Sequence, residues 1–307
     1  MFTYTAVLTT FASAAALAAA APASAAVQPV AEDAREVDAL AGHVVWVKPA
    51  TASSKSQIVL DGEPRAAMAG GRQPDLGTDS RGRVIVVFIR HGDVWVFDPV
   101  TRRARRLRAT HRGLPERHPT VSRGRVGWVQ ARGSGRRAVD RLVFAKLQAR
   151  RPQLRSVPGG GAARRVEGLE LSGRVLAIST SQRNLRADET GPVRVQLVRP
   201  GRTPVTALAG VNSVNQETTF AGLALTSSWV YVAQTRTDIS GTTTVIRRAA
   251  SRRRSQRLVL GEDFIGQENA PRRRVDSVAV GPRGALLMAT SGTGPDRIER
   301  EASPAWR

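Results

Sequence analysis

A short apolar run recurs along the chain, and it is the feature that most constrains the fold. Each run is four or five residues long and rich in Val, Ile, Leu and Ala, the length of a β-strand and too short for most helices. The runs begin at Val44, Val84, Val126, Val175, Val230 and Leu286, with spacings of 40, 42, 49, 55 and 56 residues. A period of this size predicts one structural unit that is repeated six times.

The content of one unit is clearest in residues 74–108. After a polar entry it holds the apolar run Val84–Ile89, a turn at His91–Asp93, a second apolar run at Val94–Phe97 and a basic final segment. Apolar β-branched and aromatic residues favour a pleated surface, and turns at this spacing connect antiparallel strands. Each unit therefore reads as one four-stranded antiparallel sheet, and six such sheets predict an all-β, six-bladed β-propeller.

Further runs occur at matching places in the other units. The second run is found at Gln57–Leu60, Val94–Phe97, Arg141–Phe144, Val193–Val198, Thr243–Ile246 and Arg297–Arg300. The third run is found at Arg65–Ala69, Ala104–Leu107, Gln153–Val157, Pro204–Leu208 and Ser255–Leu260, and the sixth unit has none. A propeller closes its ring by lending a strand from one terminus to the blade at the other, a role that falls here to residues 27–35. Because that segment has poor strand character, five blades plus an irregular cap is the alternative.

The first 26 residues differ from the rest. They carry no charged side chain, and an Ala-rich stretch is followed by Pro22 and the small residues Ala23–Ala26. This pattern is typical of a secretory signal peptide with an A-x-A cleavage site, although the segment lacks the usual Lys or Arg. We expect a signal peptide at residues 1–26, a single propeller domain at residues 27–307, and a secreted or cell-envelope location. An uncleaved membrane anchor is the rival interpretation.

The sequence also limits the chemistry. There is no Cys, so disulfides and thiolate metal sites are excluded. No G-x-S-x-G, H-E-x-x-H, Walker loop or EF-hand loop is present. The four histidines, His43, His91, His111 and His118, have no ligand-like spacing. The sequence therefore predicts no catalytic residue, and binding is favoured over catalysis.

The turn ahead of the strongest run carries a family resemblance. Ser80–Arg83, Ser122–Arg125, Ser172–Arg174 and Gly281–Gly284 each place a Gly in a tight hairpin. Residues 118–128 (HPTVSRGRVGW) and 93–101 (DVWVFDPVT) resemble the TolB-like β-propeller repeat, with P-x-x-S-P-D-G-x-x-I-x-F followed by L-Y-V-x-D-x-x-T-G. The likeness is good in units two and three, partial in four and six, and faint in one and five. It implies a ring that docks proteins or accompanies a hydrolase domain.

Polar residues mark the start of the first strand in most units. They are Asp38, Asp75, His118, Glu167 and Asp276, with Glu217 slightly earlier in its unit. First strands line the axial channel of a propeller, so these side chains are expected to converge at one mouth. One hypothesis is a site for a polar ligand or a hard cation such as calcium. The other is that each acid only accepts hydrogen bonds from loop amides or pairs with Arg. No other cofactor is expected.

The net charge is +22, from 47 basic and 25 acidic residues. Only Lys48, Lys55 and Lys146 are lysines, and arginines cluster on the predicted outer strands. The candidate polyanion contacts are Arg102, Arg103, Arg105, Arg106, Arg252, Arg253 and Arg254. Arg suits phosphate and carboxylate groups, although a GC-rich coding bias explains the same composition. The export signal and the lack of an aromatic stacking series argue against nucleic acid.

Two functional classes stay open. The first is a secreted, non-catalytic, monomeric propeller that binds a protein or an anionic polymer of the cell envelope. Such a protein would contact a membrane only peripherally or through an uncleaved N-terminal segment. The second is a propeller hydrolase or lactonase in which the acids at the channel mouth hold a metal.

Overall fold

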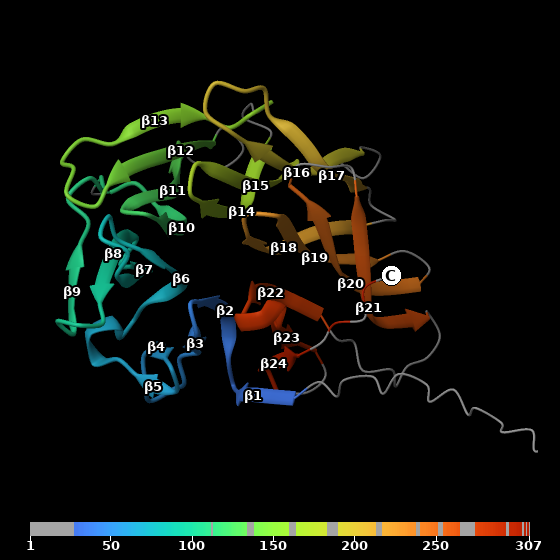
Figure 1. Ribbon diagram of the computed structural model, residues 1–307, viewed down its shortest axis with the longest axis horizontal. Helices are drawn as coiled ribbons and strands as arrows, with labels where there is room; N and C mark the ends of the chain where they lie inside the picture. The colour runs from blue at the N-terminus through green and yellow to red at the C-terminus, as the bar shows by residue number, and fades with distance from the viewer. Residues whose placement is uncertain are drawn as a thin grey trace, which may run out of the picture.

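The computed structural model describes residues 28–306 apart from 112, 134–137, 160–163, 183–189, 213–216, 238–239, 251–253, 265–273, 293–294, 303 and 305. These residues form six four-stranded antiparallel sheets around a central channel (Figure 1). The six-bladed prediction is confirmed, and the five-blade alternative is wrong. The predicted signal peptide lies outside the described residues.

The strands of the first three blades follow one another in sequence. Blade 1 holds β2 (Arg35–Leu40), β3 (His43–Lys48), β4 (Gln57–Leu60) and β5 (Glu63–Pro64). Blade 2 holds β6 (Arg72–Thr78), β7 (Val84–Arg90), β8 (Asp93–Asp98) and β9 (Arg103–Arg106). Blade 3 holds β10 (Glu116–Ser122), β11 (Arg125–Arg132), β12 (Val139–Lys146) and β13 (Gln153–Ser156). In each blade the recurrent apolar run forms the second strand, as its β-propensity predicts.

The other three blades complete the ring. Blade 4 holds β14 (Arg164–Ser172), β15 (Val175–Gln182), β16 (Gly191–Val198) and β17 (Val205–Asn212). Blade 5 holds β18 (Glu217–Leu225), β19 (Trp229–Thr237), β20 (Ser240–Ala249) and β21 (Ser255–Phe264). Blade 6 holds β22 (Arg274–Val280), β23 (Leu286–Ser291) and β24 (Arg297–Glu301). Its fourth strand comes from the other end of the chain.

That closing strand is β1 (Gln28–Glu32), which pairs antiparallel with β24. The predicted closure by residues 27–35 is therefore confirmed, with β2 beginning at Arg35. The sequence of β1 has weak strand propensity, but the unpaired edge of β24 provides the hydrogen-bonding partner that makes the segment a strand.

One predicted element is wrong. Residues 65–69 were expected to form the outer strand of blade 1, but this strand is only Glu63–Pro64 and is followed by the 3-10 helix η1 (Ala66–Met68). Pro64 lacks the amide hydrogen that would extend the ladder. The apolar residue of the segment, Met68, is instead fully buried between blades 1 and 2.

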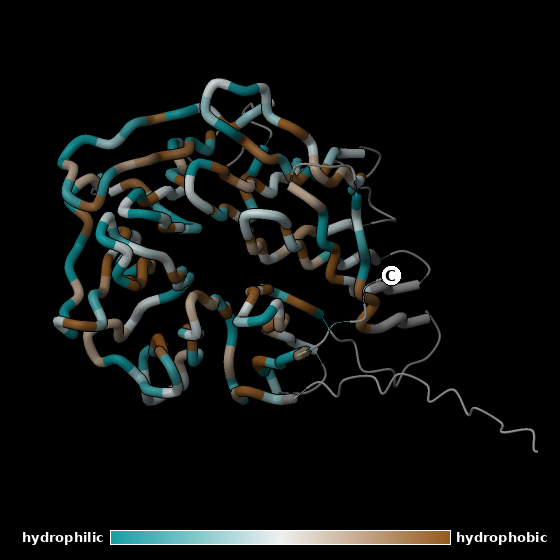
Figure 2. Tube along the Cα trace, viewed as in Figure 1, coloured by the Kyte–Doolittle hydropathy of each residue, from teal (hydrophilic) through white to brown (hydrophobic). Residues whose placement is uncertain are grey.

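The core consists of six apolar clusters, one at each contact between neighbouring blades. Val, Leu and Ile dominate them, and Trp128 and Phe88 are the largest fully buried side chains. Figure 2 shows hydrophobic segments inside the blades and hydrophilic stretches along outer strands such as β9 and β13. A second short helix, η3 (Pro282–Gly284), lies between β22 and β23. Among the described residues no helix has the length and apolarity needed to cross a membrane.

Candidate functional site

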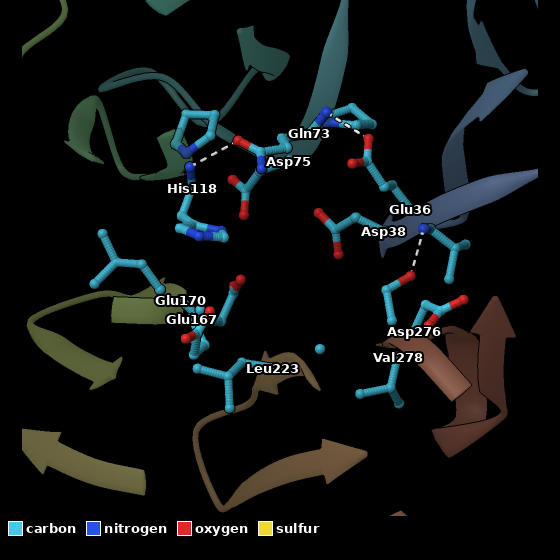
Figure 3. A pocket seen from close by; sticks show the side chains of 17 residues that line it. Glu36, Asp38, Gln73, Asp75, His118, Glu167, Glu170, Leu223, Asp276 and Val278 are labelled. Atoms are coloured by element: carbon cyan, nitrogen blue, oxygen red, sulfur yellow. Dashed lines mark hydrogen bonds between the residues drawn. The ribbon is translucent and has the colours of Figure 1, made fainter. Parts of the chain in front are cut away.

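Every first strand contains a β-bulge where it pairs with the second strand of its blade. The residues at these register shifts include Glu36, Gln73, His118, Glu167, Gly222 and Asp276. A bulge takes one residue out of the ladder and redirects its side chain. All six residues line one cavity of about 180 Å³ at one mouth of the channel (Figure 3). We call this cavity the channel mouth.

Three acids lie deeper, namely Asp38, Asp75 and Glu170. Asp38 and Glu170 also line a second cavity of about 340 Å³ toward the other end of the channel, so they stand where the two cavities meet. Asp38 accepts hydrogen bonds from the amides of Ala39 (2.7 Å) and Leu76. Asp75 accepts one from the Val121 amide at 2.7 Å. These bonds join blade 1 to blade 2 and blade 2 to blade 3, and they fix the carboxyl groups in place.

Burial dominates the titration of the deeper acids. It raises the pKa of Asp38 to about 6, against the hydrogen bonds from Leu76 and Ala39 that lower it. Burial, and then the charge of Asp38, raise the pKa of Asp75 well above its usual range. The pKa of Glu170 is likewise raised well above its usual range by burial and by the charges of Asp75 and Asp38. The side chains of Asp75 and Glu170 also act on each other's pKa, so the pair favours keeping a proton on one of the two carboxyl groups.

The bulge residues are individually positioned. The Glu36 carboxylate accepts a hydrogen bond from the Gln73 amide at 2.6 Å, and burial raises its pKa. The Gln73 side chain accepts one from the His118 amide at 2.9 Å. The Glu167 carboxylate accepts one from the Ser181 hydroxyl at 2.6 Å. Three neighbouring blades are therefore linked through their bulges.

The five channel residues predicted from the sequence, Asp38, Asp75, His118, Glu167 and Asp276, all line the channel mouth. They occupy two levels, because Asp38 and Asp75 lie behind the bulges. Glu217 starts β18, and Gly222 holds the bulge position of blade 5.

Sequence reasoning missed Glu36, Gln73 and Glu170. A signal for two of the bulges was available, since Pro74 and Pro119 follow Gln73 and His118 directly. Proline inside a strand is confined to bulges and edges. Glu170 carries no comparable signal, because only closure of the ring brings blades 2 and 4 to the same channel and Glu170 near Asp75.

Two ion pairs lie at the rim of the channel mouth. Arg165 pairs with Glu167 at 3.4 Å, and Arg274 pairs with Asp276 at 3.3 Å. Within the described part of the chain, no three His, Asp or Glu side chains are arranged to hold a metal ion. The calcium hypothesis has no geometric support from these residues and stays a prediction.

The candidate polyanion contacts fall into two separate places. Arg102, Arg103 and Arg105 are exposed at the outer edge of blade 2, where Arg106 pairs with Asp93 at 2.9 Å. Arg254 is exposed beside β21 of blade 5, and Arg252 and Arg253 lie outside the described residues. Blades 2 and 5 are three positions apart in the ring, so the described arginines Arg102 and Arg254 lie on opposite sides of the molecule (Figure 1).

Solved structures resemble the whole described ring. An acylaminoacyl peptidase has a TM-score of 0.53 at 10% identity, and the match covers 90% of this chain and 52% of the peptidase. A puromycin-hydrolyzing peptidase of Mycobacterium tuberculosis has a TM-score of 0.52 at 15% identity, covering 90% of this chain and 44% of that one. A protein of unknown function from Dyadobacter fermentans gives 0.51 at 11% identity, covering 90% and 99%.

This chain thus spans about half the length of the two peptidases. No family model matches the sequence, and no curated protein matches it either. Similarity at this level of identity concerns the fold alone. By its structure the chain is a six-bladed β-propeller that resembles about half of each of these two peptidases in shape.

Proposed function

We propose that the chain is a non-catalytic, TolB-like docking propeller that takes part of its partner into the channel mouth. The observation that supports this most strongly is the convergence of six bulges on one cavity, because a bulge costs ladder hydrogen bonds and is kept where a side chain must be redirected. Five of the six blades contribute a polar side chain there. The partner is a secreted or envelope protein that presents a protruding side chain or chain end.

The alternative of a metal-assisted hydrolase needs several acids around one point. The channel mouth brings acids together, but none of the described groups is arranged as a metal site. The deeper acids are instead satisfied by backbone amides and by each other. Binding accounts for this arrangement with fewer assumptions than catalysis does.

Blocking the channel mouth should abolish docking. Asp276 is partly exposed at the rim, so Asp276→Trp is expected to place an indole over the cavity without disturbing the core. Residues 27–307 would be immobilised and used to capture proteins from envelope extract. We expect the substitution to remove the captured partner.

Ser172→Trp is the matched control, because Ser172 lines the cavity at the opposite end of the channel. It should leave capture unchanged. If both variants retain the same partner as the unmodified chain, the channel mouth is not the docking site.

Binding of an anionic envelope polymer would use the exposed edge of blade 2. Within the part of the chain that the structure describes, Arg102, Arg103 and Arg105 form no ion pair with an acid, whereas Arg106 pairs with Asp93. Replacing these three arginines by Gln should lower the salt concentration at which the protein leaves a heparin column, since each phosphate or sulfate contact adds to the salt dependence. Arg254→Gln on blade 5 is the single-site comparison. Unchanged elution of the triple variant would leave composition bias as the explanation of the cluster.

A further inference from the structure

We propose that the group entering the channel mouth is an organic cation, a guanidinium or alkylammonium on a short apolar stem, whose charged head reaches Asp38, Asp75 and Glu170. This inference rests on the proposed function and names the chemistry of the group that docks. It applies equally to a Lys or Arg side chain of a protein partner and to a free amine of the same shape.

The lining of the channel mouth is strongly biased in charge. It includes the acids Glu36, Asp38, Asp75, Glu167, Glu170 and Asp276 and contains neither Lys nor Arg. The whole chain has the opposite balance, 47 basic against 25 acidic residues. The two rim acids, Glu167 and Asp276, have arginine partners just outside the cavity, and the charges of Arg72 and Arg35 act on Glu36. The three deeper acids form no ion pair within the described part of the chain. A cationic head would therefore enter a site of complementary charge.

The deepest carboxylate lacks a positive partner of its own. The groups that favour the charged form of Asp38 are two backbone amides, and no basic side chain contributes to its pKa. Buried carboxylates are ordinarily paired with a cation or neutralised by a proton. In the unliganded protein the raised pKa values of Asp75 and Glu170 favour a proton at this pair. A cation supplied by the ligand would take its place.

A second, independent observation is the side chain of His118. The imidazole points into the cavity (Figure 3), and its ring forms no hydrogen bond within the described part of the chain. Burial, with the charges of Arg117 and Arg165, lowers its pKa to about 3. The ring is therefore neutral, with one nitrogen able to accept a hydrogen bond from a ligand N–H.

Blade 5 supplies an apolar wall opposite these acceptors. Its bulge residue, Gly222, has φ +56, and a Cβ there would lie 2.5 Å from the Ser277 Cα. Only glycine fits, so this blade presents no polar side chain at the bulge. Leu223 of blade 5 and Val278 of the neighbouring blade 6 face the acids across the cavity (Figure 3). An apolar stem would pack against this wall while its charged end reaches the carboxylates. The cavity of about 180 Å³ is the size of a side chain and much smaller than a folded domain.

The test uses calorimetric titration of residues 27–307 with butylguanidinium and butylammonium at pH 8 and low salt. Neutral N-butylurea and anionic butyrate are the matched probes. We expect both cations to bind at least about tenfold more tightly than N-butylurea, which corresponds to about 1.4 kcal/mol. Binding should weaken as the pH falls below about 6, because Asp38 then takes up a proton. Binding should also release protons to the buffer, since the cation favours the charged forms of Asp75 and Glu170, whose pKa values are raised in the unliganded protein.

Variants locate the cation. Asp38→Asn should weaken butylguanidinium binding at least about tenfold, and Glu170→Gln is the second variant if the first fails to fold. Asp93→Asn, which removes the Arg106 pair at the outer edge of blade 2, should leave binding unchanged. Equal affinity for butylguanidinium and N-butylurea, or undiminished binding in a folded Asp38→Asn protein, would overturn the inference.

The two proposals fail separately. If Asp276→Trp abolishes capture of a partner but no cation binds, docking at the channel mouth stands and the cation assignment is wrong. If the cations bind but Asp276→Trp captures the partner as well as the unmodified chain does, the cation site is supported and the partner docks elsewhere.

Discussion

The protein is expected to be more stable at pH 5 than at pH 8, the reverse of what ion-paired carboxylates produce. Burial raises the pKa of Asp38 from 3.8 to about 6 in the folded state, so the protonated form favours folding. The stability that this group contributes is fully present below pH 4 and is lost as the pH rises through about 6. A shift of about two pKa units corresponds to about 3 kcal/mol. The raised pKa values of Asp75 and Glu170 act in the same direction.

A further buried acid, Glu116, does not line the channel mouth but makes the free energy of unfolding fall with rising pH in the same way. Glu116 is only 1% exposed and accepts hydrogen bonds from the Val94 amide at 3.0 Å and the Trp128 indole at 3.0 Å. Burial raises its pKa from 4.5 to about 7, with these bonds opposing the rise. Its contribution to stability therefore disappears between about pH 4.5 and pH 7, and the decline should be complete near pH 8.

Denaturant unfolding between pH 4.5 and pH 8.5 measures this dependence. Asp38→Asn should flatten the curve and raise the free energy of unfolding at pH 8, because it removes a buried charge. Asp79→Asn is the opposing control. Burial acts against the charge of Asp79, but hydrogen bonds from the amide and guanidinium of Arg83 and the amide of Arg81 outweigh it and lower its pKa. That variant should lose stability at neutral pH. A free energy of unfolding that rises steadily from pH 5 to pH 8 would contradict the assignment.

The buried acids also bear on function. At neutral pH they cost the fold stability, and apolar residues of similar size would remove that cost. Residues that lower the stability of the folded state are common in binding sites, because they are kept for binding. The variant that gains stability at pH 8, Asp38→Asn, is the same one expected to lose cation binding, so the two measurements test one physical cause.

The ring could be predicted from the sequence because it depends on periodic apolar strands. The local run of apolar residues is enough to predict the strands that begin at Val84 and Val126, and the spacing of such runs predicts the repeated sheets. The outer strand of blade 1 was predicted wrongly because Pro64 ends its ladder early. The channel acids were predicted to converge because first strands share one axis, and this part of the site required no side-chain detail.

Glu36 and Glu170 could not be predicted from the alternation of inward and outward side chains along a strand. A bulge adds one residue and reverses which side chain faces the channel, so Glu36 was overlooked two residues before Asp38. Glu170 meets Asp75 only after blades 2 and 4 have closed around the axis. Glu170 and Asp75 are distant in sequence and come together, whereas the arginine clusters have similar sequences and are far apart. Arg102 and Arg254 lie on opposite sides of the ring.

The largest single loss of stability is expected from Gly77→Ala in β6. A Cβ at Gly77 would lie 2.0 Å from the Val121 carbonyl oxygen and 2.7 Å from the Val121 carbonyl carbon. The obstacle is backbone of the neighbouring first strand, which cannot rotate away as a side chain could. Blades 2 and 3 would have to separate at the channel wall, and we expect a cost of about 3 kcal/mol or more in the free energy of unfolding.

The comparison residue is Gly281, which also lies outside the left-handed region and whose nearest neighbouring atom would be 3.6 Å from an added Cβ. Gly281→Ala should change the free energy of unfolding by less than about 1 kcal/mol, as measured by the same denaturant unfolding. Gly77→Ala has a further consequence for the site. The Val121 amide donates to Asp75 at 2.7 Å, so moving Val121 away from β6 would lengthen this bond and displace the carboxyl that meets Glu170. If Gly77→Ala still folds, we expect it to bind butylguanidinium more weakly than Gly281→Ala does. Equal stability and equal affinity of the two variants would contradict both expectations. The close approach of β6 and β10 would then neither limit the stability of the fold nor position the acids.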